Sequence, residues 1–311
     1  MLAYALSRIT RALVTIVLIV TAAFVVLRLT GDPATIILGP DAPPQAYEAF
    51  RRNWGLDEPL WVQYLAYFGA VMEGDLGRSM RDGRAALDIV RDRVPMTLAL
   101  TLPALAFNLV IGLTAGVAAA LNRNSWIDRA IMAVSVLGFT VPSFVMGLTL
   151  ALIFAVKLRW LPSGGSETWA HAVLPVISMG LIGAAVIARF TRSAMLEVLG
   201  QPYIRTASAK GLTWREVVLF HALPNAAIPT LTIIGFMVGS LVAGAVVIES
   251  VFSWPGVGRL LVNAVANRDL AVVQTILLFV GFAMVLANLI VDLAYGWIDP
   301  RLRVKTLKAG G

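Results

Sequence analysis

The chain has no cysteine and only two histidines among its 311 residues. Without cysteine there can be no disulfide, no thiolate metal site and no cysteine nucleophile. The two histidines, His171 and His221, are separated by 50 residues and fall on opposite sides of the topology predicted below. A site built on a histidine pair is therefore not expected, and we predict no metal ligand in this chain.

Charge is also scarce, since Asp, Glu, Lys and Arg make up 14% of the residues, against 59% that are hydrophobic. Soluble domains carry about 25% charged residues, so this balance, with a mean hydropathy of +0.82, indicates a membrane protein. The formal net charge of +7 then has a simple explanation, because Lys and Arg gather in cytoplasmic loops. We expect a lipid bilayer, and no nucleic acid, as partner.

Motifs for chemistry are missing as well. The sequence has no Gly-x4-Gly-Lys-Ser/Thr phosphate loop, so ATP binding through that motif is not expected. It shows no Ser/His/Asp set, His-Glu-x-x-His or paired carboxylates in a plausible arrangement for catalysis. We therefore predict that the chain is not an enzyme, has no catalytic residues and holds no cofactor of its own.

Six apolar stretches are long enough to cross a membrane, which takes about 20 residues each. They run approximately Ile9–Leu27, Thr97–Leu121, Ala130–Val156, Ala172–Ala188, Ile228–Ile248 and Leu270–Val291. The first stretch exceeds the core of a secretory signal, so it is interpreted as an uncleaved span. The sequence thus predicts an all-α integral membrane protein with six transmembrane helices, in which Pro103 and Pro142 could bend their spans.

The basic residues between these stretches predict the orientation. Thirteen lie on one side of the membrane, namely Arg8, Arg11, Arg123, Arg129, Arg189, Arg192, Arg205, Lys210, Arg215, Arg301, Arg303, Lys305 and Lys308. The short loops of the other side hold only Lys157, Arg159, Arg259 and Arg268. Because the richer side is cytoplasmic, both termini are expected in the cytoplasm. The segment from about Thr30 to Pro95 would be extracytoplasmic, and its Pro and Gly-Asp punctuation predicts short helices joined by turns.

The fourth inner segment, about Arg189 to Pro224, carries the most information. Met195 to Lys210 can be helical apart from a break around Gly200-Gln201-Pro202, and Gly211 suits the left-handed position just past a helix end. Thr213-Trp214-Arg215-Glu216 has the pattern of a capping box, in which a hydroxyl and a carboxylate cap one helix start reciprocally. Its basic residues and Trp214 would suit docking to an acidic or aromatic-lined partner.

This segment resembles the cytoplasmic loop of ABC importer permeases, whose pattern is Glu-Ala-Ala, three residues, Gly, nine residues, Ile-x-Leu-Pro. Gly211 is followed by nine residues and then His221-Ala222-Leu223-Pro224, whereas the Glu-Ala-Ala positions hold Arg205, Thr206 and Ala207. That departure resembles the dipeptide, oligopeptide and nickel branch. Gly-Leu-Asp-x-Pro-Leu (Gly55–Leu60), Gly-Asp-Leu-Gly-x-Ser (Gly74–Ser79) and Asp299-Pro300-Arg301-x-Arg303 are similar to the same branch.

The resemblance implies a type I importer fold and a permease subunit of an ATP-driven importer for di- or oligopeptides or a related small solute. It implies an inner-membrane location, and as partners a second permease, two ATPase subunits that bind ATP and Mg²⁺, and an extracytoplasmic solute-binding protein. The expected parts are residues 1–94 (first span and outer segment), 95–300 (permease core) and 301–311 (cytoplasmic tail). The expected ATPase-coupling residues are Arg205, Thr206, Ala207, Lys210, Gly211, Thr213, Trp214, Glu216, Leu223 and Pro224.

Two alternatives remain open at this point. A secondary transporter would usually show internal repeats or broken, acid-bearing helices at the membrane midplane, and a membrane-embedded hydrolase would need catalytic groups inside the membrane. The ionisable residues nearest the spans, Arg28, Arg189, Glu249 and Asp292, are expected at span ends where they reach water. Asn108 and Asn288 are expected to bond between helices. The pairs Gly112/Gly116 and Gly235/Gly239 permit close helix contact, either inside the chain or with a second permease.

Overall fold

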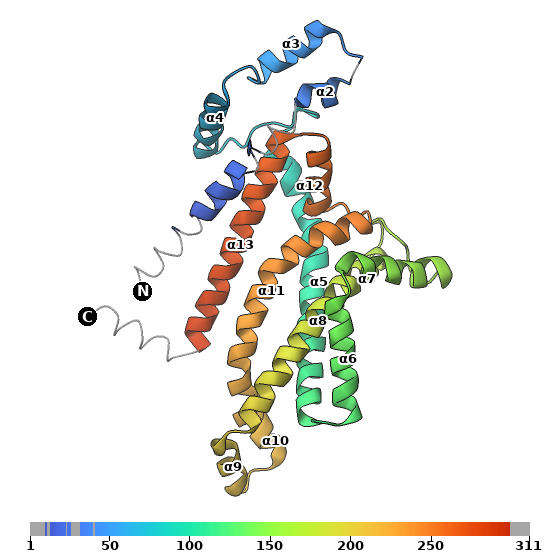
Figure 1. Ribbon diagram of the computed structural model, residues 1–311, viewed down its shortest axis with the longest axis vertical. Coiled ribbons are helices and arrows are strands. Elements are labelled where there is room, and N and C mark those ends of the chain that lie inside the picture. Colours follow the sequence, from blue (N-terminus) through green and yellow to red (C-terminus); the bar gives the residue numbers. More distant parts are fainter. Residues whose placement is uncertain (1–9, 11–12, 23, 26–31, 40, 299–311) are drawn as a thin grey trace, which may run out of the picture. The chain divides into compact units, whose positions relative to one another are not determined.

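The computed structural model describes residues 10, 13–22, 24–25, 32–39 and 41–298. Within them the regular elements are helices, and the one strand-like feature is an isolated bridge between Arg78 and Ala85. The chain divides into two compact units, one of residues 1–97 and 255–285, the other of residues 98–254 and 286–311. The all-helical prediction is therefore confirmed for the part of the chain that is described (Figure 1).

The first unit contains the segment predicted to form short helices. These are α2 (Pro33–Leu38), α3 (Pro44–Asn53) and α4 (Leu60–Met72). Each begins at or directly after a proline, whose fixed φ suits a helix start. Gly55, Gly74 and Gly77 adopt positive φ in the turns that follow α3 and α4, so the predicted punctuation by proline and glycine is confirmed.

The core of the first unit joins residues far apart in the sequence. Buried side chains from the start of α5 (Ala86–Leu121), from α12 (Val257–Ala266) and from the start of α13 (Leu270–Ile298) form one cluster. Asp269, just before α13, accepts hydrogen bonds from the Ser79 hydroxyl and from the Met80 amide, the latter at 3.3 Å. The segment after α4 is thereby tied to the turn between α12 and α13.

The second unit is built around one long helix, α8 (Ala170–Leu199), which packs against α6 (Trp126–Thr140) and α11 (Leu223–Val251) (Figure 1). The other elements of this unit are the rest of α5, α7 (Ser143–Leu150), the π-helix η1 (Ala151–Lys157), α9 (Pro202–Ala209), α10 (Trp214–Glu216), the π-helix η2 (Val217–Ala222) and the end of α13 from residue 286. The short helices α9 and α10 lie together at one end of α8 (Figure 1).

Glycines allow α5 and α8 to approach closely. A Cβ atom at Gly116 would lie 2.6 Å from the carbonyl oxygen of Ala188, and one at Gly112 would lie 2.7 Å from the Cβ atom of Ile187. The Gly112/Gly116 pair therefore packs inside this chain, which is one of the two possibilities that the sequence left open. Near it the fully buried Asn108 faces carbonyl oxygens of Ala104 and Gly180. With the amide turned so that its nitrogen faces these oxygens, it donates to both, and the bond to Gly180 on α8 is the predicted bond between helices.

Three helices in the described part of the chain are long and apolar enough to span a membrane: Ala86–Leu121, Ala170–Leu199 and Leu270–Ala287. Two bent pairs raise the number to five if each counts as one span, and the second of these pairs, Trp214–Ala227 with Pro229–Gly235, is bent by 43°. The predicted first span, Ile9–Leu27, lies partly outside the described residues, within which it forms the apolar helix Leu13–Ala22.

The predicted span Ala130–Val156 is broken into two parts. The chain turns by 107° between α6 and the segment Ser143–Lys157. Val141 has an extended backbone and Pro142 is the N-cap of α7. Because proline disfavours the helical conformation in the residue before it, the helix ends there. The possibility that Pro142 bends its span is confirmed in this stronger form, whereas Pro103 lies within the unbroken α5.

One expectation about a charged residue also needs correction. Arg189 is exposed on α8, and its guanidinium carbon is 5.0 Å from the ring centre of Phe139 on α6, so the expectation that it reaches water stands. Glu249 is fully buried in α11 and does not reach water in this chain. Arg28 is outside the described residues, as are the side chains of Asn288 and Asp292.

Candidate functional site

The candidate site is the segment between α8 and α11, at the end of the second unit (Figure 1). Helix α8 ends at Leu199, and after Gly200 the chain starts α9 at Pro202. Helix α9 ends at Ala209, and Gly211 follows with a φ of 88°. The predicted helix, break and glycine turn are all confirmed. Glycine tolerates this left-handed conformation without steric cost, which explains the residue at this turn.

A capping box starts the next helix, as predicted. The Thr213 hydroxyl oxygen accepts from the Glu216 amide at 3.4 Å, while Glu216 Oε2 accepts from the Thr213 amide at 2.8 Å. Both orphan amides at the helix start are thereby satisfied. No residue separates α10 from η2 or η2 from α11, so the helical segment continues from Trp214 into α11. Pro224 lacks an amide hydrogen, and the wider π turns just before it accommodate that missing donor.

The inner face of this segment is buried in one apolar cluster. Ala207 and Ile204 of α9 pack with Val217 and Val218 of η2 and with Met195 of α8. Ala120 at the end of α5 and Ala226 in α11 belong to the same cluster, and Leu223 packs against it while half-buried. The segment is therefore a packed unit fixed to the ends of three long helices.

The outer face is exposed and carries the other predicted residues. Arg205, Thr206, Lys210, Gly211, Thr213, Trp214, Glu216 and Pro224 all lie on the surface. The Trp214 side chain is 56% exposed and that of Phe220 is 70% exposed. The structure thus brings the ten predicted residues together, eight on the surface and two, Ala207 and Leu223, in the supporting layer. An exposed face with cations and large aromatic groups is suited to binding another protein.

Sequence reasoning missed the ion pair that lies beside this segment. Arg192, in the last turns of α8, donates from Nε to Asp128 Oδ1 at 2.5 Å and from Nη2 to Asp128 Oδ2 at 2.7 Å. Asp128 is 3% exposed and sits in the first turn of α6, where the Asn124 amide also donates to its Oδ2. The signal in the sequence was Ser125-x-x-Asp128, a capping pattern that places a carboxylate at a helix start.

Comparison with known families matches both parts of the chain. Residues 112–304 match the binding-protein-dependent transport system inner membrane component, and residues 1–101 match the N-terminal domain of the corresponding membrane component. The glutathione transport system permease protein GsiC of Escherichia coli strain K12 is 41% identical over 306 residues, covering 98% of this chain and all of that protein. The GsiC protein of Salmonella choleraesuis strain SC-B67 is 42% identical over the same length.

A solved structure has a similar fold. A chain of the inward-facing MetNI methionine ABC transporter superposes with a TM-score of 0.59 at 22% sequence identity. The superposition covers 68% of this chain and 97% of that one. The type I permease fold predicted from the sequence is thereby confirmed.

Proposed function

Since this chain belongs to the family of binding-protein-dependent transport system inner membrane components, and so is a multi-pass permease subunit of an ABC importer, we propose that residues 189–224 form its ATPase-coupling loop. The observation that carries this proposal is the combination of an exposed, capped turn and a buried support. The turn offers Trp214, Arg205 and Lys210 on its surface, while its inner face is packed onto α5, α8 and α11. A force on this turn reaches three long helices directly.

The partners follow from this assignment as part of the same proposal. Two ATPase subunits bind ATP and Mg²⁺ and hydrolyse the nucleotide, and one of them receives the coupling loop of this chain. A second, homologous permease completes the pathway, and a solute-binding protein delivers cargo on the other side. Both termini are then cytoplasmic, as is the coupling loop, in agreement with the excess of Lys and Arg on that side.

The cargo is proposed to be a di- or oligopeptide or a related small solute. Curated relatives aligned over 98% of this chain are named as glutathione transport permeases, and glutathione is itself a modified tripeptide. A short peptide of this size is therefore the first cargo to test.

The test of the coupling loop uses two substitutions of Gly211. A Cβ atom there would meet nothing within 4 Å, so a side chain changes the backbone preference rather than the packing. Gly211→Val places a β-branched residue at positive φ, where an ordinary L residue costs about 1–2 kcal/mol. Gly211→Asn is the matched control, because asparagine adopts this conformation much more readily. The chain is co-expressed with its partners, purified as a complex and reconstituted in liposomes.

We expect Gly211→Val to lower the ratio of peptide taken up to ATP hydrolysed by about tenfold. The reason is that about 1.4 kcal/mol of backbone strain, which corresponds to a factor of about ten, would disfavour the native conformation of the turn. The amount of the chain in the membrane should stay normal. Gly211→Asn should keep most of the uptake. Equal uptake by the valine variant and the wild type would contradict the coupling role. Uptake that depends on a proton gradient rather than on ATP would instead support the secondary-transporter alternative.

A further inference from the structure

A distinct feature of the first unit is the apolar outer surface of helix α4. Its 13 residues include no Asp, Glu, Lys, Arg or His, and none of them is buried. The exposed positions, which we call the α4 stripe, are Leu60, Trp61, Leu65, Ala66, Gly69 and Met72. The side chains of Trp61, Leu65 and Met72 are 67%, 60% and 87% exposed. Because residues three or four positions apart lie on one side of a helix, the stripe is one surface.

The neighbouring helix α3 has an outer surface of the opposite kind. Its exposed positions include Glu48 and Arg51, and Arg51 Nε lies 3.2 Å from a carboxylate oxygen of Asp57. Such a surface is suited to water. An exposed apolar patch with polar residues at its rim instead marks a place where another molecule binds. The α4 stripe fits this description, because the exposed acids Glu58 and Glu73 flank it.

The other side of α4 packs against the end of the predicted first span. The described part of that span is the apolar helix Leu13–Ala22. In its last turn the Thr21 hydroxyl lies 2.8 Å from the Tyr64 hydroxyl of α4. Just after this helix, the Phe24 ring meets the Tyr64 ring at a T-shaped angle, with 5.5 Å between the ring centres. These contacts hold α4 at the end of the apolar helix.

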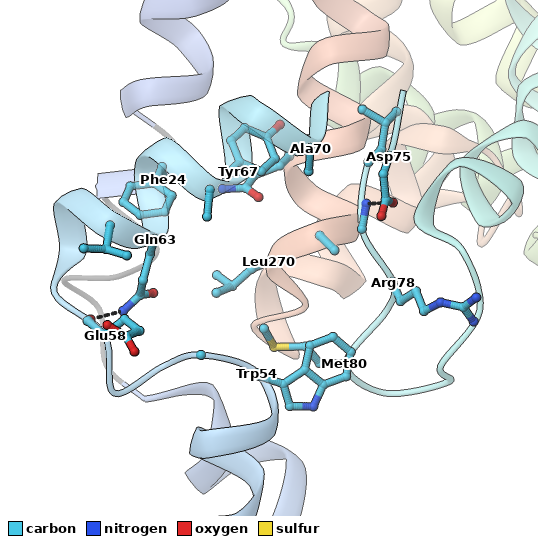
Figure 2. A pocket seen from close by; sticks show the side chains of 17 residues that line it. Phe24, Trp54, Glu58, Gln63, Tyr67, Ala70, Asp75, Arg78, Met80 and Leu270 are labelled. Carbon is cyan, nitrogen blue, oxygen red and sulfur yellow. Dashed lines mark hydrogen bonds between the residues drawn. The ribbon is translucent and has the colours of Figure 1, made fainter. Parts of the chain in front are cut away.

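The start of α13 lies at the same place. Leu270 of α13 lines one pocket together with Tyr67 and Ala70 of α4 (Figure 2). Leu270 is also the first residue of the segment Leu270–Ala287, which is long and apolar enough to cross a membrane. Helix α4 is therefore level with the first turn of a membrane-spanning segment.

The two apolar helices are themselves neighbours. A Cβ atom on Gly281 of α13 would lie 3.4 Å from Cγ1 of Ile16 in the helix Leu13–Ala22. Helix α4 thus lies at one end of a pair of adjacent apolar helices. The end of a span is the level at which the hydrocarbon of a bilayer gives way to the headgroups.

This location identifies lipid as the molecule that covers the α4 stripe. The 13 residues of α4 are too few to cross a bilayer, which takes about 20, but an apolar helix face at this level can enter the boundary between headgroups and acyl chains. Tryptophan is enriched at the same level, and Trp61 belongs to the stripe. The helix Leu13–Ala22, which α4 contacts, also exposes Val14 and Leu18, so the stripe adjoins a surface that a span presents to lipid.

We propose that α4 is an interfacial helix, whose stripe is inserted among the lipids at the edge of the bilayer while Tyr64 and Tyr67 face the protein. The segment from about Thr30 to Pro95, expected outside the membrane, is then anchored in it at α4. This inference goes beyond the proposed function and does not depend on it, because it requires only that the chain spans a membrane.

The absence of cysteine from the chain makes a direct test possible, since each single-cysteine variant carries one spin label. Leu65→Cys and Met72→Cys place the label on the α4 stripe, where both side chains are exposed and the packing is left intact. Glu48→Cys, exposed on the charged surface of α3, is the matched control. The full-length chain is reconstituted in nanodiscs of phosphatidylethanolamine and phosphatidylglycerol. Electron paramagnetic resonance then compares collisions of the label with oxygen, which concentrates in lipid, and with a water-soluble nickel complex.

We expect the ratio of oxygen to nickel accessibility to be several-fold higher at positions 65 and 72 than at position 48. A ratio at either stripe position equal to that of the control would place α4 in water and overturn the proposal. An immobilised label that meets neither reagent would show that protein, such as a second copy of the chain, covers the stripe, and would overturn it equally. Monodisperse elution of each variant at the wild-type volume controls for folding.

Discussion

The Asp128–Arg192 ion pair allows a quantitative prediction about the second unit. Substituting Arg192→Leu leaves the Asp128 carboxylate without the two short hydrogen bonds that it accepts from the guanidinium. The Asp128 side chain is 4% exposed and that of Arg192 is 25% exposed, so the pair is neither a surface pair nor fully enclosed. Losing one partner costs about 3–5 kcal/mol in a fully buried pair, whereas exposed pairs contribute about 0.2–1 kcal/mol.

An intermediate loss of about 1.5–3 kcal/mol is therefore expected, which is the range for hydrogen bonds to charged groups. A change of this size lowers the thermal midpoint by about 3–12 °C, given about 2–4 °C per kcal/mol for units of this length. The double variant Asp128→Leu with Arg192→Leu should recover much of the loss, because no unpaired charge remains.

Thermal unfolding of the detergent-solubilised chain, followed by tryptophan fluorescence, measures these midpoints. The matched control is Arg84→Leu, which removes one partner of the exposed pair between Arg84 and Asp92, 2.7 Å apart. The control should leave the midpoint where it is. If Arg192→Leu were as stable as the control, or if the double variant were less stable than Arg192→Leu, the reasoning that this partly buried pair stabilises the contact between α6 and α8 would be refuted.

Two further predictions concern packing and pH. Gly116→Ala should destabilise the chain by about 1–3 kcal/mol, because its Cβ would lie 2.6 Å from backbone and side-chain atoms of α8. Gly244→Ala in α11 is the control and should not destabilise the chain, because a Cβ there would meet nothing within 4 Å. Equal thermal midpoints for the two variants would argue against the close contact at Gly116. Burial raises the pKa of Asp269 above its ordinary value, so the carboxyl group binds a proton more tightly in the folded than in the unfolded state. The free energy of unfolding should therefore rise as the pH falls from above the folded-state pKa towards the unfolded value of about 3.9. In Asp269→Asn the unfolding midpoint should depend less on pH across that interval. If the variant keeps the pH dependence of the wild type, other groups cause it.

Local signals in the sequence predicted the structure of the segment between α8 and α11 well because it is determined locally. A capping box depends on two side chains three residues apart, and the turn at Gly211 depends on the backbone freedom of one residue. The same holds for the helices α2, α3 and α4, whose starts coincide with prolines. In these places the residues that decide the conformation are neighbours in the chain.

Long-range pairing explains what the sequence could not predict. The fourth apolar stretch was expected to run from about Ala172 to Ala188, whereas α8 continues through Arg189 and Arg192 to Leu199. Both cations are accommodated by residues more than 45 positions earlier, Arg189 by the ring of Phe139 and Arg192 by the carboxylate of Asp128. A hydropathy pattern records the charges but not their partners. Similarly, Pro142 predicted a bend, but the angle depends on how α7 packs against α8 and α11.

The arrangement around the proposed coupling loop has a consequence for how movement would spread through the permease. The apolar cluster that contains Ile204 and Val217 fixes the loop to α5, α8 and α11, but α6 contributes nothing to that cluster. At the start of α6, two hydrogen bonds from Arg192 to Asp128 join this helix to α8. Because a bidentate charged pair resists both sliding and rotation, it makes α6 follow α8 when the loop is displaced. Along the chain, α6 is followed by the 107° turn into α7. The Asp128–Arg192 pair therefore connects the proposed coupling loop, through α8, to the helix that leads into this turn.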